Sequence, residues 1–268
     1  MQRPLAAALA LVGTAACSYI FELPSSDVLP AEPAGEGGLE DAPVGDGPPP
    51  YVPTPPVPFC ETQLTPFIYC SDFDDEPAPD LAGIGALQES DGRLSLSSAV
   101  ALSPPRSLLV IARGSNAGAS VTRDLAADPD GVSLSFDLLV SAWTTDGDGA
   151  QVSELVLGDP ASRCALLLGG TATTWTLTQV CTAGGAETAR VTNDSATPIV
   201  RGRWQRFRLG VAFAPAKSAF LEIDGTRVVE VAGAAPLQQG PTSIGLGMKS
   251  VSDGSVTLFQ DNVLVTSP

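Results

Sequence analysis

The feature that most constrains the fold is a strict alternation of apolar and polar residues in two segments of the chain. In GVSLSFDLLV (131–140) every even-numbered residue is apolar, and two serines and an aspartate separate them on the other face. In RFRLGVAF (206–213) the odd-numbered residues are apolar, and Arg206 and Arg208 lie on the opposite face. A period of two places alternate side chains on opposite faces of a strand, so both segments predict β-strands with one buried face.

Similar short strands are expected throughout residues 60–268. The run AFLEIDGTRVVEV (219–231) carries Asp224-Gly225 between two β-rich halves, which is a strong hairpin signal. No long segment keeps a helical period, and turn residues recur about every ten positions. Further strands are expected at residues 93–97, 107–112, 119–123, 152–157, 163–168, 175–181, 188–192, 243–248 and 255–265. These strands predict an all-β domain over 60–268, a two-sheet antiparallel β-sandwich of the jelly-roll kind.

Residues 1–16 have the anatomy of a signal peptide. Arg3 supplies a positive charge, residues 5–12 form a short apolar run, and small residues precede Cys17. The run is shorter than the ~20 apolar residues that a membrane-spanning helix needs. The arrangement before Cys17 resembles the lipobox of bacterial lipoproteins, which implies cleavage before the cysteine and its acylation. Thr14 stands where that pattern usually has leucine, and ordinary secretion with Cys17 free or discarded is the alternative.

Residues 17–59 are expected to form a lipid-anchored, disordered linker. Between residues 18 and 58 the chain has eleven prolines, seven acidic residues and no basic residue. Proline removes backbone donors and like charges repel, so the composition favours an extended spacer. A proline-rich ligand for an aromatic groove is the alternative. With Cys17 acylated, the lipid membrane is an expected partner, and the expected location is the bacterial cell envelope, at the outer membrane or cell surface.

Composition excludes several classes of function. The chain has 14 basic residues against 30 acidic residues, a net charge of −16, which excludes a nucleic-acid binder because nothing would neutralise the phosphates. It has no histidine, which removes Ser-His-Asp and Cys-His nucleophiles and most catalytic zinc sites. No cofactor is expected.

The cysteines predict two disulfides. The chain has five cysteines, an odd number that acylation of Cys17 would explain. Cys60, Cys70, Cys164 and Cys181 remain, and an exported chain lies in an oxidising compartment. Four cysteines allow three connectivities, which the sequence alone does not decide. A hairpin of the two strands that carry Cys164 and Cys181 would set these residues opposite each other, so bridges between nearest neighbours are favoured.

Three stretches carry a resemblance to a known family. They are WQRFRLGVAF, which begins at Trp204, FLEIDGTRVVEV with Asp224-Gly225, and LFQDNVLV with Asp261-Asn262-Val263. Together they resemble the concanavalin A-like lectin/glucanase superfamily, and in particular laminin-G-like domains of bacterial surface proteins. The resemblance covers residues 60–268 and implies a β-sandwich. It says little about function, since that superfamily includes lectins, adhesion modules, glycoside hydrolases and inert spacers.

The resemblance also raises the question of a glucanase site. The superfamily's retaining glucanases carry Glu-x-Asp-x-x-Glu on one strand, and a retaining enzyme needs two carboxyl groups about 5–5.5 Å apart. Glu222 and Asp224 match the start of that motif, but Arg227 stands at the position of its second Glu. Asp224 also belongs to the expected hairpin turn. The chain is therefore expected not to be an enzyme.

The loop after the first alternating strand is the expected ligand site. Trp143 offers a ring for stacking on a sugar, and Asp146 and Asp148 offer carboxylates beside glycines that let a backbone approach closely. If the alternation persists to Trp143, its ring falls on the polar face, away from the core, although one bulge would reverse this.

Calcium is the one metal ion that these acidic residues suggest. Asp146 and Asp148 form one acidic group, and Asp72, Asp74 and Asp75 form a second after Cys70. Calcium takes six to eight oxygen ligands, and the EF-hand spacing is absent. A plain Gly/Asp loop and an acidic strand end are favoured, and no metal ligand is assigned.

Three functions remain open. The favoured one is a surface-anchored, non-catalytic recognition module for a carbohydrate or matrix polymer. The alternatives are a structural envelope module that contacts another protein, and a glycoside hydrolase that acts on a polysaccharide. An exposed aromatic platform would favour the first, a broad apolar patch the second, and two convergent carboxylates the third.

Overall fold

The structure is a computed structural model that describes residues 57–74, 81, 83–125, 130–145, 149–213, 217–232 and 240–267. The expected signal peptide (1–16), Cys17 and nearly all of the linker (17–59) lie outside the described residues. Within the described ranges, no helix has the length and apolar character needed to cross a membrane.

The described chain folds almost entirely as β-strands, which confirms the predicted fold class. One short 3-10 helix, η1 (Phe59–Thr62), precedes them. The strands are β1 (Tyr69–Ser71), β2 (Ala86–Ser90), β3 (Gly92–Ser97), β4 (Ser107–Arg113), β5 (Ala117–Leu125), β6 (Gly131–Thr145), β7 (Ala150–Asp159), β8 (Ser162–Gly170), β9 (Thr174–Ala183), β10 (Ala186–Pro198), β11 (Trp204–Ala212), β12 (Ser218–Ile223), β13 (Thr226–Ala232), β14 (Thr242–Val251) and β15 (Gly254–Thr266).

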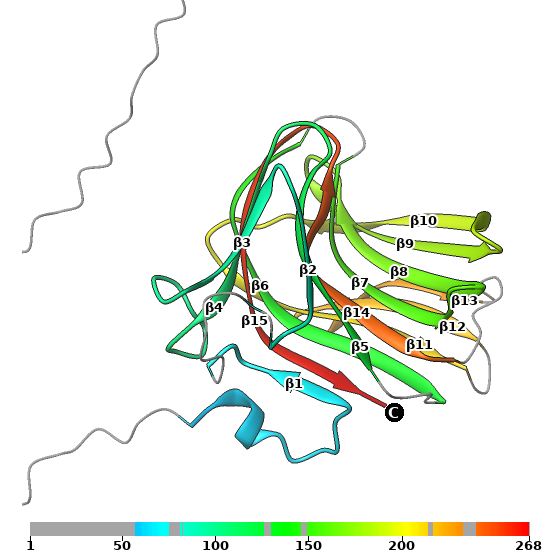
Figure 1. The fold of residues 1–268 in the computed structure, drawn as a ribbon, viewed down its shortest axis with the longest axis horizontal. Helices are drawn as coiled ribbons and strands as arrows, with labels where there is room; N and C mark the ends of the chain where they lie inside the picture. Colours follow the sequence, from blue (N-terminus) through cyan, green and yellow to red (C-terminus); the bar gives the residue numbers. More distant parts are fainter. Residues whose placement is uncertain are drawn as a thin grey trace, which may run out of the picture. The chain divides into compact units, whose positions relative to one another are not determined.

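These strands form two antiparallel sheets that pack as a sandwich (Figure 1). The eight-stranded sheet has the order β13-β12-β11-β6-β15-β4-β3, and β1 pairs with β15 beside this path. The seven-stranded sheet has the order β10-β9-β8-β7-β14-β5-β2. In each sheet three neighbouring pairs are consecutive in sequence and the remaining pairs are distant, as in a jelly roll.

The core lies between the sheets, where the alternating strands place their apolar faces. Phe136 on β6 and Phe207 on β11 stack within the eight-stranded sheet, with ring centroids 5.8 Å apart. Trp175 on β9 reaches across from the seven-stranded sheet and meets Phe207 edge-on at 4.8 Å. All three side chains are fully buried. The outer face of each sheet therefore carries the polar residues of the alternating strands.

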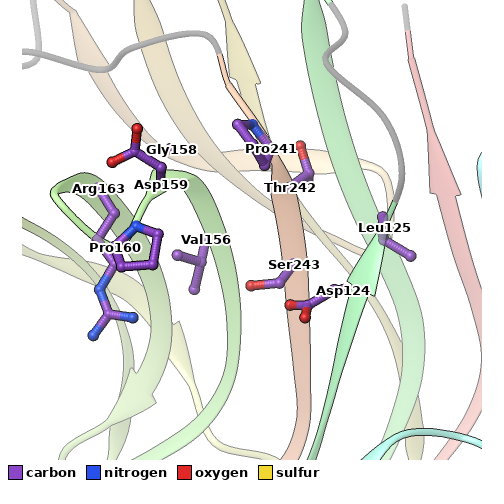
Figure 2. Close-up of a pocket in the computed structure, with 10 residues that line it drawn as sticks. All are labelled: Asp124, Leu125, Val156, Gly158, Asp159, Pro160, Arg163, Pro241, Thr242 and Ser243. Carbon is purple, nitrogen blue, oxygen red and sulfur yellow. The ribbon is translucent and has the colours of Figure 1, made fainter.

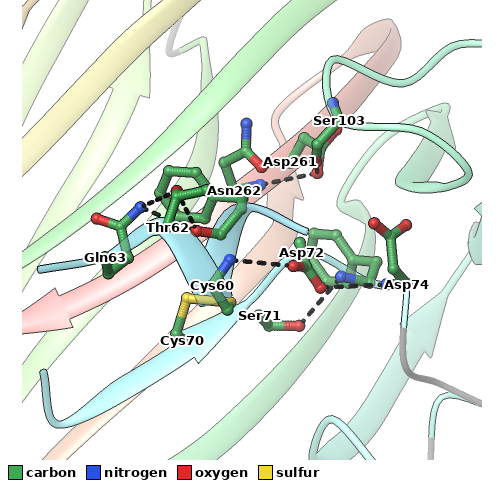
Figure 3. Close-up of a disulfide and its surroundings, with 12 residues drawn as sticks. Cys60, Thr62, Gln63, Cys70, Ser71, Asp72, Asp74, Ser103, Asp261 and Asn262 are labelled. Carbon is green, nitrogen blue, oxygen red and sulfur yellow. Dashed lines mark hydrogen bonds between the residues drawn. A yellow bond between two sulfur atoms is a disulfide. The ribbon is translucent and has the colours of Figure 1, made fainter. Parts of the chain in front are cut away.

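Both predicted disulfides are present. Cys164 on β8 lies directly opposite Cys181 on β9, with a Cα–Cα distance of 4.0 Å. Cys60 in η1 is bonded to Cys70 in β1, with a Cα–Cα distance of 5.8 Å (Figure 3). Because β1 pairs with β15, this second bridge fastens the start of the domain to its last strand.

The Asp-Gly hairpin is also confirmed. Asp224 and Gly225 join β12 to β13, with φ values of 52° and 77°, as a two-residue hairpin turn requires. Glu222 lies beside this turn and pairs with Arg208 at 3.4 Å and with Arg227 at 2.9 Å. The glucanase-like residues thus belong to an ion-pair cluster rather than to a pair of carboxylates.

Candidate functional site

The predicted exposure of Trp143 is wrong. Its side chain is 1% exposed, and its indole Nε1–H donates a hydrogen bond to the carbonyl oxygen of Thr171 at 2.8 Å. The ring meets Trp175 edge-on, with centroids 5.4 Å apart. Trp143 therefore belongs to the core and cannot stack on a sugar.

A bulge in β6 explains the error. Trp143 pairs with Val256 and Ala142 with Thr257, but Leu258 pairs with Val140, so Ser141 has no partner in the ladder. One extra residue moves every later side chain to the opposite face of a strand. The other two residues of the expected ligand site, Asp146 and Asp148, lie outside the described residues.

The second acidic group supports the fold rather than a metal. Asp72 accepts a hydrogen bond from the backbone N–H of Cys60 at 3.1 Å (Figure 3). Asp74 accepts one from the backbone N–H of Arg106 at 3.1 Å. Asp75 lies outside the described residues. Within the described ranges, no three acidic or cysteine side chains are close enough together to hold a metal ion.

Among the described residues, a set of hollows lies elsewhere, on the outer face of the seven-stranded sheet. Three adjoining hollows of about 320, 450 and 420 Å³ share lining residues and cross this face. We call them together the groove. The first and middle hollows share Val156, Arg163 and Ser243, and the middle and third share Gln151, Leu167 and Arg190.

Small residues make the floor of the groove low. Ala165 on β8 and Gly245 on β14 occupy outward positions in neighbouring parts of the sheet. A methyl group at Gly245 would lie 2.7 Å from Cγ of Glu154, which faces it across the ladder. The absence of a side chain at Gly245 therefore makes room for Glu154 to lie along the floor.

A single ion pair lies in the middle hollow. Glu154 on β7 pairs with Lys249 on β14; the Glu154 side chain is 12% exposed and the Lys249 side chain 49%. Glu154 is the one carboxylate among the residues that line this hollow. The pair places a proton acceptor and a proton donor next to each other in the groove, a suitable arrangement for acid–base chemistry.

Hydroxyl groups line the side of the groove toward β10. Thr176, Thr178 and Thr182 on β9 and Thr192 on β10 face outward. The hydroxyls of Thr178 and Thr192 lie 3.1 Å apart and share a hydrogen bond. Among the residues that line the three hollows none is aromatic. Ligand recognition here would depend on hydrogen bonds and charge rather than on ring stacking.

At the opposite end, charged groups face one another across the groove. Figure 2 shows Asp124 and Ser243 on one side and Asp159 and Arg163 on the other. Asp159 is already engaged, since its Oδ1 accepts hydrogen bonds from the backbone N–H groups of the β7–β8 turn at 2.8 and 2.9 Å. Arg163 is exposed and makes no ion pair with any residue that the structure describes. Its guanidinium group remains available for an anionic ligand.

A buried carboxyl, Asp261, lies on the other sheet, away from the groove. It is fully buried and accepts hydrogen bonds from the backbone N–H groups of Leu102 and Ser103 at 2.8 and 3.0 Å. Figure 3 shows Ser103 beside Asp261. Burial raises the pKa of Asp261 to about 6, although these hydrogen bonds act in the opposite direction. Asp261 thus holds a loop in place, and the Asp-Asn-Val run has a structural role here.

Asp137, opposite Asp261 in the ladder, belongs to the same polar cluster. Its Oδ2 accepts hydrogen bonds from Arg206 Nη1 at 2.9 Å and from Asn262 Nδ2 at 3.0 Å. Burial raises the pKa of Asp137, while Arg206 acts in the opposite direction. The contacts of this cluster join β6 and β11 to each other and to the bulge in β15.

Comparison with known proteins identifies the fold. No protein-family model and no curated protein matches the sequence. Among solved structures, an endo-β-1,4-glucuronan lyase from the fungus Trichoderma reesei has 13% identity and a TM-score of 0.55, covering 76% of this chain and 92% of its own. An alginate lyase from a Chlorella virus has 7% identity and a TM-score of 0.52, covering 76% and 100%. A cellulose-induced protein, Cip1, has 14% identity and a TM-score of 0.50, covering 75% and 97%. These likenesses show a shared jelly-roll sandwich fold.

These neighbours overturn the prediction that the chain is not an enzyme. Two of them are polysaccharide lyases, so this sandwich is a fold on which polysaccharides are cleaved. The prediction rested on the absence of histidine and of a glucanase carboxylate pair. Those absences argue against particular nucleophiles and against one kind of hydrolysis, and they do not argue against cleavage by elimination, which needs neither.

Sequence reasoning missed the groove because its residues have no common motif. Glu154, Arg163, Arg190 and Lys249 come from four different strands. Each is an ordinary polar residue, and only the order of strands in the sheet brings them together. Glu154, Arg163 and Arg190 lay on predicted strands, where their outward parity was the available signal. Lys249 lay just beyond the strand predicted at 243–248.

Proposed function

We propose that this chain binds a linear polysaccharide along the groove. The observation that carries the proposal is that the three hollows share lining residues, which makes a continuous channel across the seven-stranded sheet. Its threonines, glutamines and charged side chains match a ligand that presents many hydroxyl groups. The likeness to two polysaccharide lyases supports the same class of ligand.

A second function, cleavage of the bound polysaccharide, is favoured by the ion pair in the middle hollow. Hydrolysis by the usual glycosidase mechanisms takes two carboxyl groups, one on each side of the scissile bond. The middle hollow has one carboxylate, Glu154, beside the ammonium group of Lys249. This arrangement fits elimination on a uronic acid polymer better than hydrolysis.

The elimination would use three groups of the groove. Glu154 takes the proton from the carbon next to the sugar carboxylate, and the electron pair forms a carbon–carbon double bond as the glycosidic C–O bond breaks. Lys249 gives a proton to the departing oxygen. Arg163, which lines the same hollow, pairs with the sugar carboxylate and so makes that carbon–hydrogen bond more acidic.

The experiment uses the full chain with polyglucuronate, alginate and a neutral β-glucan. Binding is measured by affinity electrophoresis, and cleavage is measured by new reducing ends and by the ultraviolet absorbance of the unsaturated product. We expect binding to at least one polymer, with cleavage of a polyuronate that generates absorbance. Glu154→Gln should abolish cleavage and keep binding, while Glu230→Gln on the other sheet should change neither.

Each result has a definite meaning for the proposal. Reducing ends without absorbance would replace elimination by hydrolysis. Binding without cleavage by the wild-type chain would overturn the second function and keep the first. Absence of binding to all three polymers by a folded chain would overturn both.

We also propose that the chain is a lipoprotein of the bacterial cell envelope. The signal-like residues 1–16 and the lipobox-like position of Cys17 support this. Metabolic labelling with palmitate should mark the wild-type chain and leave Cys17→Ala unmarked. Label that persists in Cys17→Ala would overturn the anchor.

A further inference from the structure

Strand β10 forms an exposed edge of the seven-stranded sheet. No strand of the described residues lies beyond it. It is 13 residues long, and most of its side chains are exposed, including the apolar Val191 at 36%. An edge of this length presents a row of backbone N–H and C=O groups that can pair with another strand.

The free part of this edge is a straight run between two irregularities. The ladder with β9 shifts register between Glu187 and Ala189 and again between Asp194 and Pro198. From Ala189 to Asp194 the pairing is regular. This run alone has the geometry to accept an additional strand.

The charges along the run are of opposite sign. Arg190, Thr192 and Asp194 all face outward, because all three line the third hollow of the groove. The one ion pair of Arg190 within the described residues is with Glu187 of its own strand, where Nη2 lies 2.7 Å from Oε2. Both side chains are about half exposed. Asp194 forms no ion pair with any residue within the described ranges.

We propose that β10 pairs antiparallel with β10 of a second copy of this chain, around a twofold axis at Thr192. This axis is normal to the sheet, so both grooves lie on the same face of the dimer. A residue a given number of positions before Thr192 lies opposite the residue the same number of positions after Thr192 in the other copy. Arg190 then lies opposite Asp194 of the other copy, and this pair occurs twice. Thr192 meets its own symmetry mate, and Val191 meets Asn193.

Charge favours this register over the two that are centred on the charged residues of the run, Arg190 and Asp194. Twofold pairing that keeps the grooves on one face must be centred on a residue, because opposite residues share a face. A centre at Arg190 would oppose two arginines, and a centre at Asp194 would oppose two aspartates. Like charges directly opposite each other destabilise a pair of strands, and opposite charges stabilise it.

The dimer would join the two grooves. Because Arg190, Thr192 and Asp194 line the groove where it reaches β10, each groove would continue into that of the other copy across the twofold axis. The second copy would thus lengthen the binding surface. The pairing itself does not depend on what the groove binds, so it is tested without a polysaccharide.

The test measures the mass of the full chain, carrying Cys17→Ser to prevent acylation, by light scattering after gel filtration over a range of concentrations. We expect the wild-type chain to have twice the monomer mass. Arg190→Asp places two aspartates opposite each other at both contacts, and Asp194→Arg places two arginines there. Each variant alone should therefore be a monomer.

Mixing the two variants provides the decisive result. In a mixed pair, Asp at 190 of one copy faces Arg at 194 of the other, and Asp194 of the first faces Arg190 of the second. An equimolar mixture should therefore recover the dimer mass, as should the doubly substituted chain. Arg113→Asp and Asp253→Arg, which make the same charge changes at exposed positions away from β10, should leave the wild-type dimer intact.

Three outcomes would overturn the inference. They are a wild-type chain that stays monomeric at every concentration, single variants that remain dimeric, and folded single variants whose mixture stays monomeric. Thermal unfolding of each variant distinguishes loss of the dimer from loss of the fold.

Discussion

The indole N–H of Trp143 and the carbonyl oxygen of Thr171 form a hydrogen bond of 2.8 Å that joins β6 of one sheet to the β8–β9 turn of the other. Trp143 also packs edge-on against Trp175. A residue that sequence patterning assigned to a ligand thus joins the two layers at the end of the sandwich.

Shortening this side chain should destabilise the protein. Trp143→Ala removes a fully buried indole, and we expect a loss of about 3–5 kcal/mol in the free energy of unfolding. Trp143→Phe keeps most of the ring contacts and loses the hydrogen bond to Thr171. Loss of this hydrogen bond should lower the free energy of unfolding by about 1 kcal/mol, in addition to the effect of the smaller ring. Chemical denaturation provides the measurement. Leu87→Ala, at a side chain that is 45% exposed, is the matched control and should have little effect. A Trp143→Ala protein as stable as the wild type would contradict the assignment to the core.

The Cys164–Cys181 bridge should contribute measurably to stability. It closes a loop with a sequence separation of 17, for which the chain-entropy model gives about 3 kcal/mol. The Cys164→Ala/Cys181→Ala chain should lose about that amount on denaturation. A peptide map under non-reducing conditions checks the pairing independently, and a peptide that joins Cys70 to Cys164 would refute it.

The stability of the domain should fall as the pH rises through the titration range of Asp261. Burial raises the pKa of this carboxyl from 3.8 to about 6, so the folded protein binds the proton more tightly than the unfolded chain does. Between these two pKa values the folded state holds more protons than the unfolded state, and the free energy of unfolding decreases with increasing pH. The contribution of Asp261 to the free energy of unfolding is most favourable below the pKa of the unfolded chain, and it is lost above the pKa of the folded protein.

This pH dependence is measured as a difference between two proteins. Asp261→Asn has no titrating group at this position, so subtracting its unfolding free energy from that of the wild type isolates the Asp261 contribution. We expect the difference to slope downward with increasing pH across that window. A flat or rising difference would show that the hydrogen bonds from Leu102 and Ser103 outweigh burial.

Gly245 provides a test of the groove that leaves its charges in place. A methyl group there would lie 2.7 Å from Cγ of Glu154, so Gly245→Ala should push the flexible Glu154 side chain away from Lys249. We expect about a tenfold loss in the rate of polysaccharide cleavage, equivalent to about 1.4 kcal/mol. Stability should change little. Ser250→Ala, on the same strand but outside the groove, is the control, and equal activity of both variants would exclude Glu154 from the site.

Much of the fold was readable from the sequence where the pattern was local. The alternation in 131–140 predicted β6, and the Asp224-Gly225 turn predicted the β12–β13 hairpin. The opposition of Cys164 and Cys181 followed from counting residues along one hairpin. Each of these features depends on residues that are close in sequence, at most 17 positions apart, where steric and periodic rules act directly.

The features that were missed depend on long-range contacts. β2 has five exposed residues and so no buried face to produce an alternating pattern, and β1 is three residues long. The bulge at Ser141 reflects pairing with β15, more than a hundred residues away in sequence. The groove is likewise set by sheet order, which joins β7, β8 and β14 across the chain.

The Cys60–Cys70 bridge has a mechanical consequence. A pull on the chain before Val57 reaches Cys60 and passes through the sulfur atoms directly to Cys70, bypassing the residues in between. From Cys70 the force enters β1 and, through its hydrogen bonds, the final strand β15, which lies between β6 and β4 in the eight-stranded sheet. Tension applied at the amino-terminal end is thus carried by β15 inside the eight-stranded sheet, and the seven-stranded sheet lies outside this path of force.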